Sequence, residues 1–164
     1  MIHPTAIISP KSHISKNVNI GPYCIIDENV YLDDECKLIS HVHITGRTKI
    51  GKNNTFYPFS CIGTKPQDLK YSGEPSELYI GNNNVFREGV TVNPGTKGGE
   101  MITRIENNCL FMVGCHIAHD CQISSNVIMS NNATLAGHVK INENVIIGGL
   151  CGIHQFVSLG KYSM

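Results

Sequence analysis

Residues 105–158 read, in consecutive groups of six, IENNCL FMVGCH IAHDCQ ISSNVI MSNNAT LAGHVK INENVI IGGLCG IHQFVS. The first residue of every group is large and apolar, and the fifth is cysteine, valine or alanine. These two positions are two residues apart across each junction, so on a β-strand their side chains face the same way. A period of six also differs from the heptad of a coiled coil. The pattern predicts a short strand followed by a turn, repeated.

The same register extends through most of the chain. A first run of large apolar residues goes from Ile2 to Ile62 at every sixth position, and a second covers Ile80 to Val92. With the run that begins at Ile105, the chain holds twenty-four hexads, and three hexads per triangular coil give about eight coils. Successive coils would pair roughly 4.8 Å apart. We therefore expect an all-β fold, a parallel β-helix of hexapeptide repeats, forming a single domain over residues 1–164.

Two segments interrupt the hexads. They are residues 68–79, DLKYSGEPSELY, and residues 98–104, GGEMITR. Because the other turns are tight, both segments are predicted to project from the prism as loops. Loops held on a rigid scaffold often carry functional residues.

Composition narrows the class of protein. Thirteen basic and thirteen acidic residues cancel, which does not suit a nucleic-acid-binding protein. The first residues, MIHPTAIISPKSHI, lack the apolar core of a signal peptide, and no apolar run is long enough to cross a membrane. We therefore expect a soluble, cytoplasmic chain. Six of the seven cysteines, all but Cys61, occupy the fifth hexad position, which predicts small buried side chains.

Stacking of coils brings polar residues together. Residues 18 apart lie directly above one another, which gives two neighbouring columns: His119, Gly137 and Gln155, and Asp120, His138 and Phe156. A histidine can act as a general base near neutral pH, and a glycine lets a backbone N–H approach a developing oxyanion. His116 and His154 lie close in sequence to these columns. The columns predict a reaction centre, although a lone surface histidine is commonly just solvated.

Four motifs carry a resemblance to a known family: QDLKYSGEP (67–75), HIAHDC (116–121), NNATLAGHV (131–139) and GIHQF (152–156). Together they resemble the UDP-N-acetylglucosamine O-acyltransferases of lipid A biosynthesis. The resemblance implies a left-handed β-helix that forms a homotrimer, with active sites between subunits. It implies transfer of a 3-hydroxyacyl group from acyl carrier protein to the glucosamine 3-hydroxyl of UDP-N-acetylglucosamine, in the cytoplasm of a Gram-negative bacterium. No metal or cofactor is implied, since the acyl carrier protein thioester is a substrate.

The resemblance also assigns roles to residues. It implies that His119 is the general base, Asp120 its partner and Gly137 the backbone oxyanion donor. The residues implied to contact the sugar nucleotide or the acyl chain are Gln67, Asp68, Lys70, His116, His138, His154 and Gln155.

Two departures from the family pattern are visible. Some relatives carry His-Arg-Gly-Thr where this chain has Asn93-Pro94-Gly95-Thr96. Family members also continue into a C-terminal helical region, which we expect to be absent here because the sequence stops at Met164. On that basis the 164 residues alone are expected to be weakly active or inactive, and prone to self-associate.

Several alternative functions remain open from the sequence. The N-acyltransferase that acts later in the same pathway shares the hexads but should carry an extra N-terminal domain. A CoA-dependent acetyltransferase would leave the QDLKY motif unexplained. A zinc-dependent hydratase on the same scaffold could use His116, His119 and His138 as ligands. A non-enzymatic ice-binding solenoid would need stacked outward threonines, which the columns do not provide.

Overall fold

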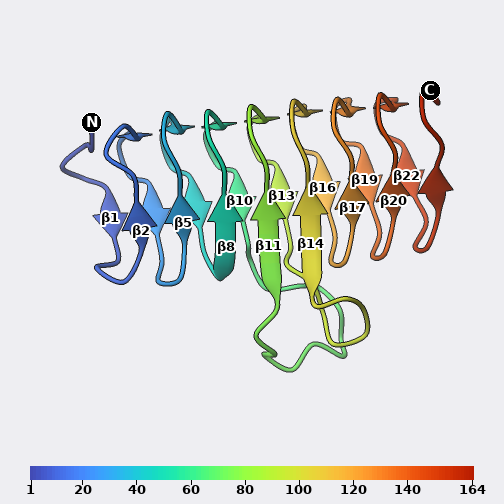
Figure 1. The fold of residues 1–164 in the computed structure, drawn as a ribbon, viewed down its shortest axis with the longest axis horizontal. Helices are drawn as coiled ribbons and strands as arrows, with labels where there is room; N and C mark the ends of the chain where they lie inside the picture. The colour runs from blue at the N-terminus through green and yellow to red at the C-terminus, as the bar shows by residue number, and fades with distance from the viewer.

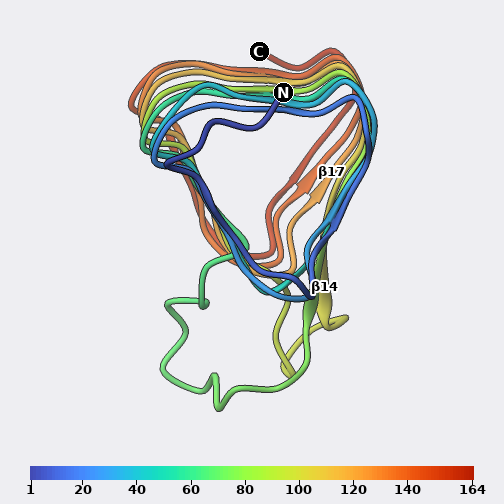
Figure 2. The same ribbon diagram turned by 90° about the vertical axis from the view of Figure 1, so that its left-hand side faces the viewer.

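The computed structural model describes residues 1–164, with twenty-three short strands and no helix. The chain passes through three strands per coil, and each coil lies beside the next (Figure 1). Viewed from the N-terminal end, the chain turns anticlockwise as it recedes, so the coil is left-handed (Figure 2). The prediction of an all-β, left-handed parallel β-helix of hexapeptide repeats is therefore confirmed.

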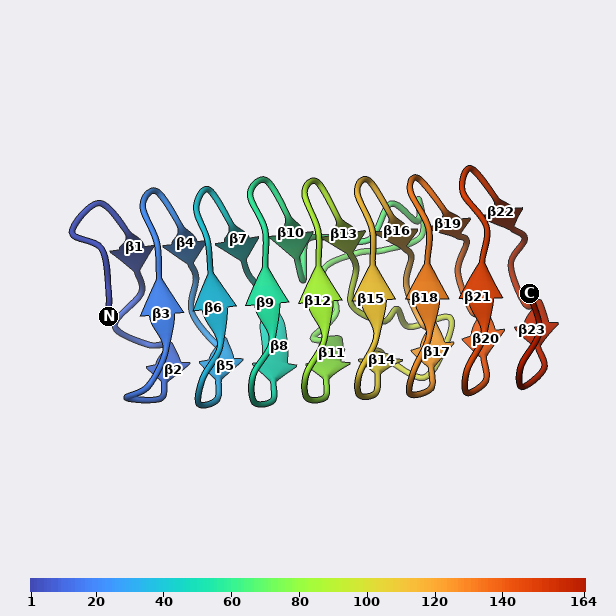
Figure 3. The same cartoon turned by 90° about the horizontal axis from the view of Figure 1, so that it is seen from above.

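Each strand pairs in parallel with the strand three places along the chain, which produces three sheets (Figure 3). The first sheet contains β1 (Ile7–Ile8), β4 (Ile25–Ile26), β7 (His43–Ile44), β10 (Cys61–Ile62), β13 (Thr91–Val92), β16 (His116–Ile117), β19 (Thr134–Leu135) and β22 (Gly152–Ile153). The second sheet contains β2 (His13–Ile14), β5 (Tyr31–Leu32), β8 (Arg47–Ile50), β11 (Glu77–Ile80), β14 (Ile102–Ile105), β17 (Gln122–Ile123), β20 (Lys140–Ile141) and β23 (Ser158–Leu159). The third sheet contains β3 (Asn19–Ile20), β6 (Lys37–Leu38), β9 (Thr55–Phe56), β12 (Val85–Phe86), β15 (Leu110–Phe111), β18 (Ile128–Met129) and β21 (Ile146–Ile147).

The core fills the inside of this prism. Thirty-three buried hydrophobic residues form one cluster that runs along the axis. The inward residues of neighbouring coils touch, as in the stack of Phe56, Phe86 and Phe111, whose ring centroids lie 4.8 and 4.9 Å apart. Each such side chain contributes roughly 1.5–3 kcal/mol by leaving water. The resulting rigid stack fixes which outward residues lie above one another.

The cysteines mostly follow the prediction from their hexad position. Five are buried, and burial raises the pKa of Cys109 and Cys115 to about 11 and that of Cys121 to about 12. The prediction was wrong for Cys151, which is exposed. Cys151 lies in the last coil, where no further coil packs over its turn.

The two interruptions project from one corner of the prism, between the first and second sheets (Figure 2). The loops end earlier than the predicted segments 68–79 and 98–104, because β11 already begins at Glu77 and β14 at Ile102. Leu78 and Thr103 are buried two residues before the large apolar residues Ile80 and Ile105, so they already follow the inward alternation. The interruptions therefore end as four-residue strands of the second sheet.

Two corners of the prism matter for the site. The loop corner consists of the turns that follow the strands of the first sheet, and the asparagine corner consists of the turns that follow the strands of the second sheet. At both corners one turn residue has a positive φ, for example Asp120 at 59° in the loop corner and Asn126 at 62° in the asparagine corner. The same backbone turn thus carries different side chains at the two corners.

Candidate active site

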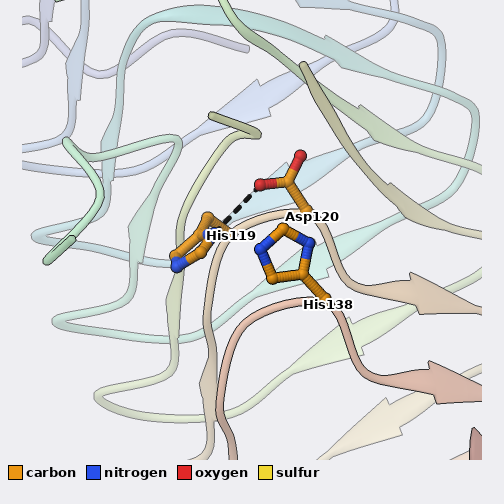
Figure 4. Close-up of side chains that lie close together, drawn as sticks. All are labelled: His119, Asp120 and His138. Atoms are coloured by element: carbon orange, nitrogen blue, oxygen red, sulfur yellow. Dashed lines mark hydrogen bonds and ion pairs between the residues drawn. The ribbon is translucent and has the colours of Figure 1, made fainter. Parts of the chain in front are cut away.

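His119 and Asp120 form a hydrogen-bonded dyad in the loop corner, on the turn between β16 and β17 (Figure 4). His119 Nδ1 lies 2.9 Å from Asp120 Oδ2, and the two side chains are 14% and 2% exposed. An ionised carboxylate only accepts hydrogen bonds, so Nδ1 carries the proton. The lone pair is then on Nε2 of the neutral ring, as a general base requires.

Asp120 is held from several sides. Thr96 donates its hydroxyl to Asp120 Oδ2 at 2.7 Å and its backbone N–H to the same oxygen at 3.0 Å. The Asp120 N–H donates to Thr103 Oγ1 at 2.8 Å. Thr96 comes from the second loop, between β13 and β14, and Thr103 from β14 itself. Neither threonine was assigned a role from the sequence, because no period in an irregular loop predicts which residue will fold back onto the dyad.

Gly137 lies against the His119 ring, as the column predicted. A Cβ on Gly137 would lie 2.5 Å from His119 Cε1 and 2.6 Å from Nε2, so no other residue fits without displacing the ring. The Gly137 N–H donates no hydrogen bond within the chain. Gly137, whose N–H has no partner within the chain, thus packs beside the unbonded Nε2 of the ring. A base and a backbone donor side by side are what activation of a hydroxyl and stabilisation of an oxyanion need.

His138 and His116 lie on either side of the dyad. The His138 ring stands edge-on to His119 at 5.0 Å between centroids, and it stacks on Phe156 at 4.6 Å. His116, in β16, has its Nδ1 2.7 Å from the Thr91 hydroxyl. Burial, with the nearby His119 as a second cause, lowers the pKa of His116 below its ordinary value. His116 is therefore neutral at neutral pH.

The remaining predicted residues lie farther from the dyad along the chain. Gln67, Asp68 and Lys70 belong to the first loop, where the Lys70 N–H donates to Asp68 Oδ1 at 2.9 Å. No hydrogen bond connects these three side chains to His119. Gln155 and His154 are exposed in the last coil, although the Phe156 N–H donates to Gly137 O at 3.3 Å, as stacking of the columns requires.

The two loops are tied to each other by Glu74. Its Oε1 accepts the Lys97 N–H at 2.9 Å, and its Oε2 accepts the Ser72 N–H at 2.9 Å and its hydroxyl at 3.3 Å. The backbone hydrogen bond from Lys97 is the largest of the causes that lower the pKa of Glu74 to about 2. Lys97 directly follows Thr96, so the first loop is fastened beside the residue that holds Asp120.

His119, Asp120 and His138 each offer one potential metal ligand, and the three atoms lie within 4.8 Å of one another (Figure 4). Two histidines and one carboxylate are a set that several transition metals accept. In the structure, however, His119 Nδ1 and Asp120 Oδ2 are already bonded to each other. His116 is outside this group and contacts Thr91 instead, so the three-histidine set of a hydratase is not assembled.

A cavity of about 360 Å³ opens beside Asp120 and His138, on the side of the second sheet. It is lined by Gly99, Glu100, Asp120, Gln122, His138, Lys140 and Phe156. A larger groove, of about 690 Å³, runs over the early coils around His13 and Tyr31 and contains no residue of the dyad. The loop corner is the candidate active site, because it combines the His119–Asp120 dyad with the unpartnered N–H of Gly137.

The sequence of this chain is similar to that of known proteins. The bacterial transferase hexapeptide (six repeats) family matches residues 102–137. The acyl-[acyl-carrier-protein]--UDP-N-acetylglucosamine O-acyltransferase of Thermodesulfovibrio yellowstonii is 53% identical over 142 residues, which cover 87% of this chain and 55% of that protein. The enzyme of the same name from Herminiimonas arsenicoxydans is 45% identical over all 164 residues, 63% of its own length.

Solved structures show the same likeness. The UDP-N-acetylglucosamine acyltransferase of Francisella novicida superposes with a TM-score of 0.97 at 37% identity, covering 99% of this chain and 59% of that one. The chain thus spans little more than half the length of the relatives it matches. The structure also contains no helix that could cross a membrane. On its sequence and its fold, the chain belongs to the UDP-N-acetylglucosamine O-acyltransferase family.

Proposed function

We propose that this chain carries the catalytic residues of an acyl transfer from acyl carrier protein to UDP-N-acetylglucosamine, the first step of lipid A biosynthesis. The observation that carries the proposal is the packing of Gly137, whose N–H has no partner within the chain, beside His119 Nε2, with Nδ1 held by Asp120. The relatives named above support the choice of donor and acceptor, because acyl carrier protein and UDP-N-acetylglucosamine appear in their names. A 3-hydroxyacyl group and the glucosamine 3-hydroxyl are the groups implied by the resemblance.

The mechanism follows from the positions of these groups. His119 Nε2 takes the proton of the sugar hydroxyl as its oxygen attacks the thioester carbonyl. The carbonyl oxygen becomes an oxyanion that accepts the Gly137 N–H, while Asp120 stabilises the imidazolium that forms. When the intermediate collapses, the C–S bond breaks and His119 returns its proton to the leaving thiolate. No step in this scheme needs a metal or a cofactor.

The substrates are proposed to lie along the loop corner. His116 and His138 flank the dyad there, and Gln67, Asp68 and Lys70 come from the loop that Glu74 ties to Lys97. His154 and Gln155 continue the corner by one coil. Substrates of this kind place the reaction in the cytoplasm of a Gram-negative bacterium.

A homotrimer with sites between subunits is proposed as the assembly. It is supported by a column of outward apolar residues on the third sheet, paired strand by strand: Val85, Leu110, Ile128 and Ile146. A flat apolar stripe on an outer face is typical of a surface that another chain covers. Light scattering on the purified chain should give three times 18.0 kDa, and a monomer at micromolar concentration would contradict sites shared between subunits.

The test of the function is a transfer assay with 3-hydroxyacyl-loaded acyl carrier protein and UDP-N-acetylglucosamine, over a series of acyl chain lengths. The ester product should form, and His119→Ala should lower kcat on the order of 10²–10⁴-fold. His13→Ala is the matched control, because His13 stacks on Tyr31 on the second sheet, far from the dyad. Wild-type turnover in His119→Ala, measured against an active wild type, would refute the proposal.

A further inference from the structure

One oxygen of Asp120 receives three donors. Asp120 Oδ2 accepts His119 Nδ1–H at 2.9 Å, the Thr96 hydroxyl at 2.7 Å and the Thr96 N–H at 3.0 Å. Thr96 is itself buried, 2% exposed, so water does not compete for these contacts. Hydrogen bonds to a charged group are stronger than neutral ones. Thr96 therefore supplies two of the three hydrogen bonds that hold this carboxylate oxygen in place.

The other oxygen of Asp120 has no partner. Oδ1 is buried without a hydrogen bond, and a Cβ on Gly99 would lie 2.4 Å from it. The loop backbone at Gly99 thus packs directly on the carboxylate group. Without the Thr96 hydroxyl, the carboxylate would lose one of the hydrogen bonds that hold it in hydrogen-bonding position towards His119 Nδ1.

Thr96 also contacts the His119 ring directly. Its Oγ1 lies 3.5 Å from His119 Nδ1, a long contact. Because the hydroxyl proton is donated to Asp120, the lone pairs of Oγ1 face the Nδ1–H. The threonine oxygen and the carboxylate oxygen then both favour the ring form that carries its proton on Nδ1.

The loop that carries Thr96 is anchored at several points. The Gly95 N–H donates to Glu77 O at 3.2 Å, and a Cβ on Gly95 would lie 2.0 Å from the Ile102 N, so the loop lies tightly against the beginning of β14. The Gly99 N–H donates to Thr96 O at 3.0 Å, and the Lys97 N–H donates to Glu74. These contacts fix the backbone on both sides of Thr96.

We propose that Thr96 is a positioning residue for the His119–Asp120 dyad, and that the loop of residues 93–101, tied down by Glu74, sets its geometry. Its chemical task is to hold the Asp120 carboxylate within hydrogen-bond distance of Nδ1, and so to keep the base lone pair on Nε2. The kinetic part of this inference rests on the proposed function. The part that concerns the His119 tautomer does not depend on it.

The test compares Thr96→Val, which removes only the hydroxyl donor at nearly constant volume, with Thr96→Ser, which keeps it. The ring nitrogens of His119 are observed by ¹⁵N NMR in the chain of 164 residues, above the pH at which the ring protonates. Wild type and Thr96→Ser should show predominantly the Nδ1–H tautomer, and Thr96→Val a mixture of both. Thr48→Val is the matched control, since Thr48 is also buried and its hydroxyl donates to Thr45 O, away from the dyad.

The same variants are then assayed for acyl transfer. Thr96→Val should lower kcat by about 10- to 100-fold, the loss expected for one hydrogen bond to a charged group, with KM changed by no more than about 2-fold. Thr96→Ser should restore most of kcat. Replacing Glu74 by alanine should lower kcat in the same direction but less, because Thr96 keeps its own contacts.

The outcomes separate the two proposals. If Thr96→Val keeps the wild-type tautomer, the positioning role is overturned, whatever the chain catalyses. If the tautomer becomes mixed but the wild type transfers no acyl group, the proposed function fails while the positioning role stands. A wild-type kcat in Thr96→Val, measured in an active wild type, would also overturn the kinetic part of the inference.

Discussion

The loop corner and the asparagine corner of the prism are built from the same left-handed turn but do different things. In five consecutive coils of the asparagine corner the positive-φ position is held by asparagine: Asn53, Asn83, Asn108, Asn126 and Asn144. The amides of the first three bond from coil to coil, with Asn53 Nδ2 3.0 Å from Asn83 Oδ1 and Asn83 Nδ2 3.1 Å from Asn108 Oδ1. In the loop corner Asn29 holds the equivalent position in an early coil, but Asp120, His138 and Phe156 hold it in the last three.

The difference shows how a repeat scaffold can acquire chemistry. Besides glycine, the left-handed region is tolerated best by asparagine, aspartate and histidine. The asparagine corner uses the neutral member of that set in five coils, and the amides of Asn53, Asn83 and Asn108 bond to one another. The loop corner uses the two titratable members, Asp120 and His138, and adds His119 one residue earlier. The loop corner thus differs from the asparagine corner in its side chains, while the backbone turn stays the same.

Exchanging aspartate and asparagine between the two corners should have the largest effect on kcat. Asp120→Asn keeps a residue that tolerates the turn, so the fold should persist, but its amide can donate to Nδ1 and so favour the wrong tautomer of His119. We expect kcat to fall on the order of 10²–10⁴-fold. The reciprocal change, Asn126→Asp, should leave kcat within about 2-fold of wild type, because the asparagine corner takes no part in the proposed reaction. Equal losses in the two variants, by steady-state kinetics, would mean that the corners do not differ in function.

A methyl group added to Gly137 should have the next largest effect on kcat. Its Cβ would enter the space of the His119 ring, and the ring or the turn must move. A 1 Å displacement of a catalytic group can cost about 10²-fold, so a loss of kcat of that order is expected for Gly137→Ala. Gly148→Ala is the control, since its Cβ would meet only Cys151 Sγ at 3.5 Å, an ordinary contact. Similar turnover in both alanine variants would exclude close packing of Gly137 on the base.

The asparagine corner should show its importance in stability rather than in catalysis. Asn83→Ala places a less tolerant residue at φ 59° and removes two amide contacts, so the free energy of unfolding should fall by about 1–2 kcal/mol. Urea titration measures this loss, and kcat below the unfolding transition should match wild type. A fall in kcat with no loss of stability would reverse the roles that we give to the two corners.

The sequence predicted the periodic part of the site and missed the rest for a physical reason. The contact of Gly137 with His119 followed from the 18-residue stacking, which a rigid core enforces at every coil. Thr96 could not be predicted, because it lies in an insertion where no period applies. The loop ends were misplaced for a related reason: Leu78 and Thr103 resume the inward alternation before the large apolar residue that was used to detect the register.

The smallest expected effect concerns pH and the connection between the loops. The pKa of Glu74 is lowered to about 2, first by the Lys97 N–H, whereas the ordinary value is 4.5. A carboxyl group with a lowered folded-state pKa contributes stability above its unfolded pKa and loses it as pH falls through the folded value. The tie between the loops should therefore be intact above about pH 4.5 and be lost progressively towards pH 2. The amide shift of Lys97, followed by NMR, should titrate with a midpoint near 2, and Glu74→Gln should abolish that titration while the asparagine-corner amides stay unchanged. A midpoint near 4.5 would mean that Glu74 does not fasten the loop of Thr96, and the loop corner would then depend on the remaining contacts of Gly95 and Thr96 alone.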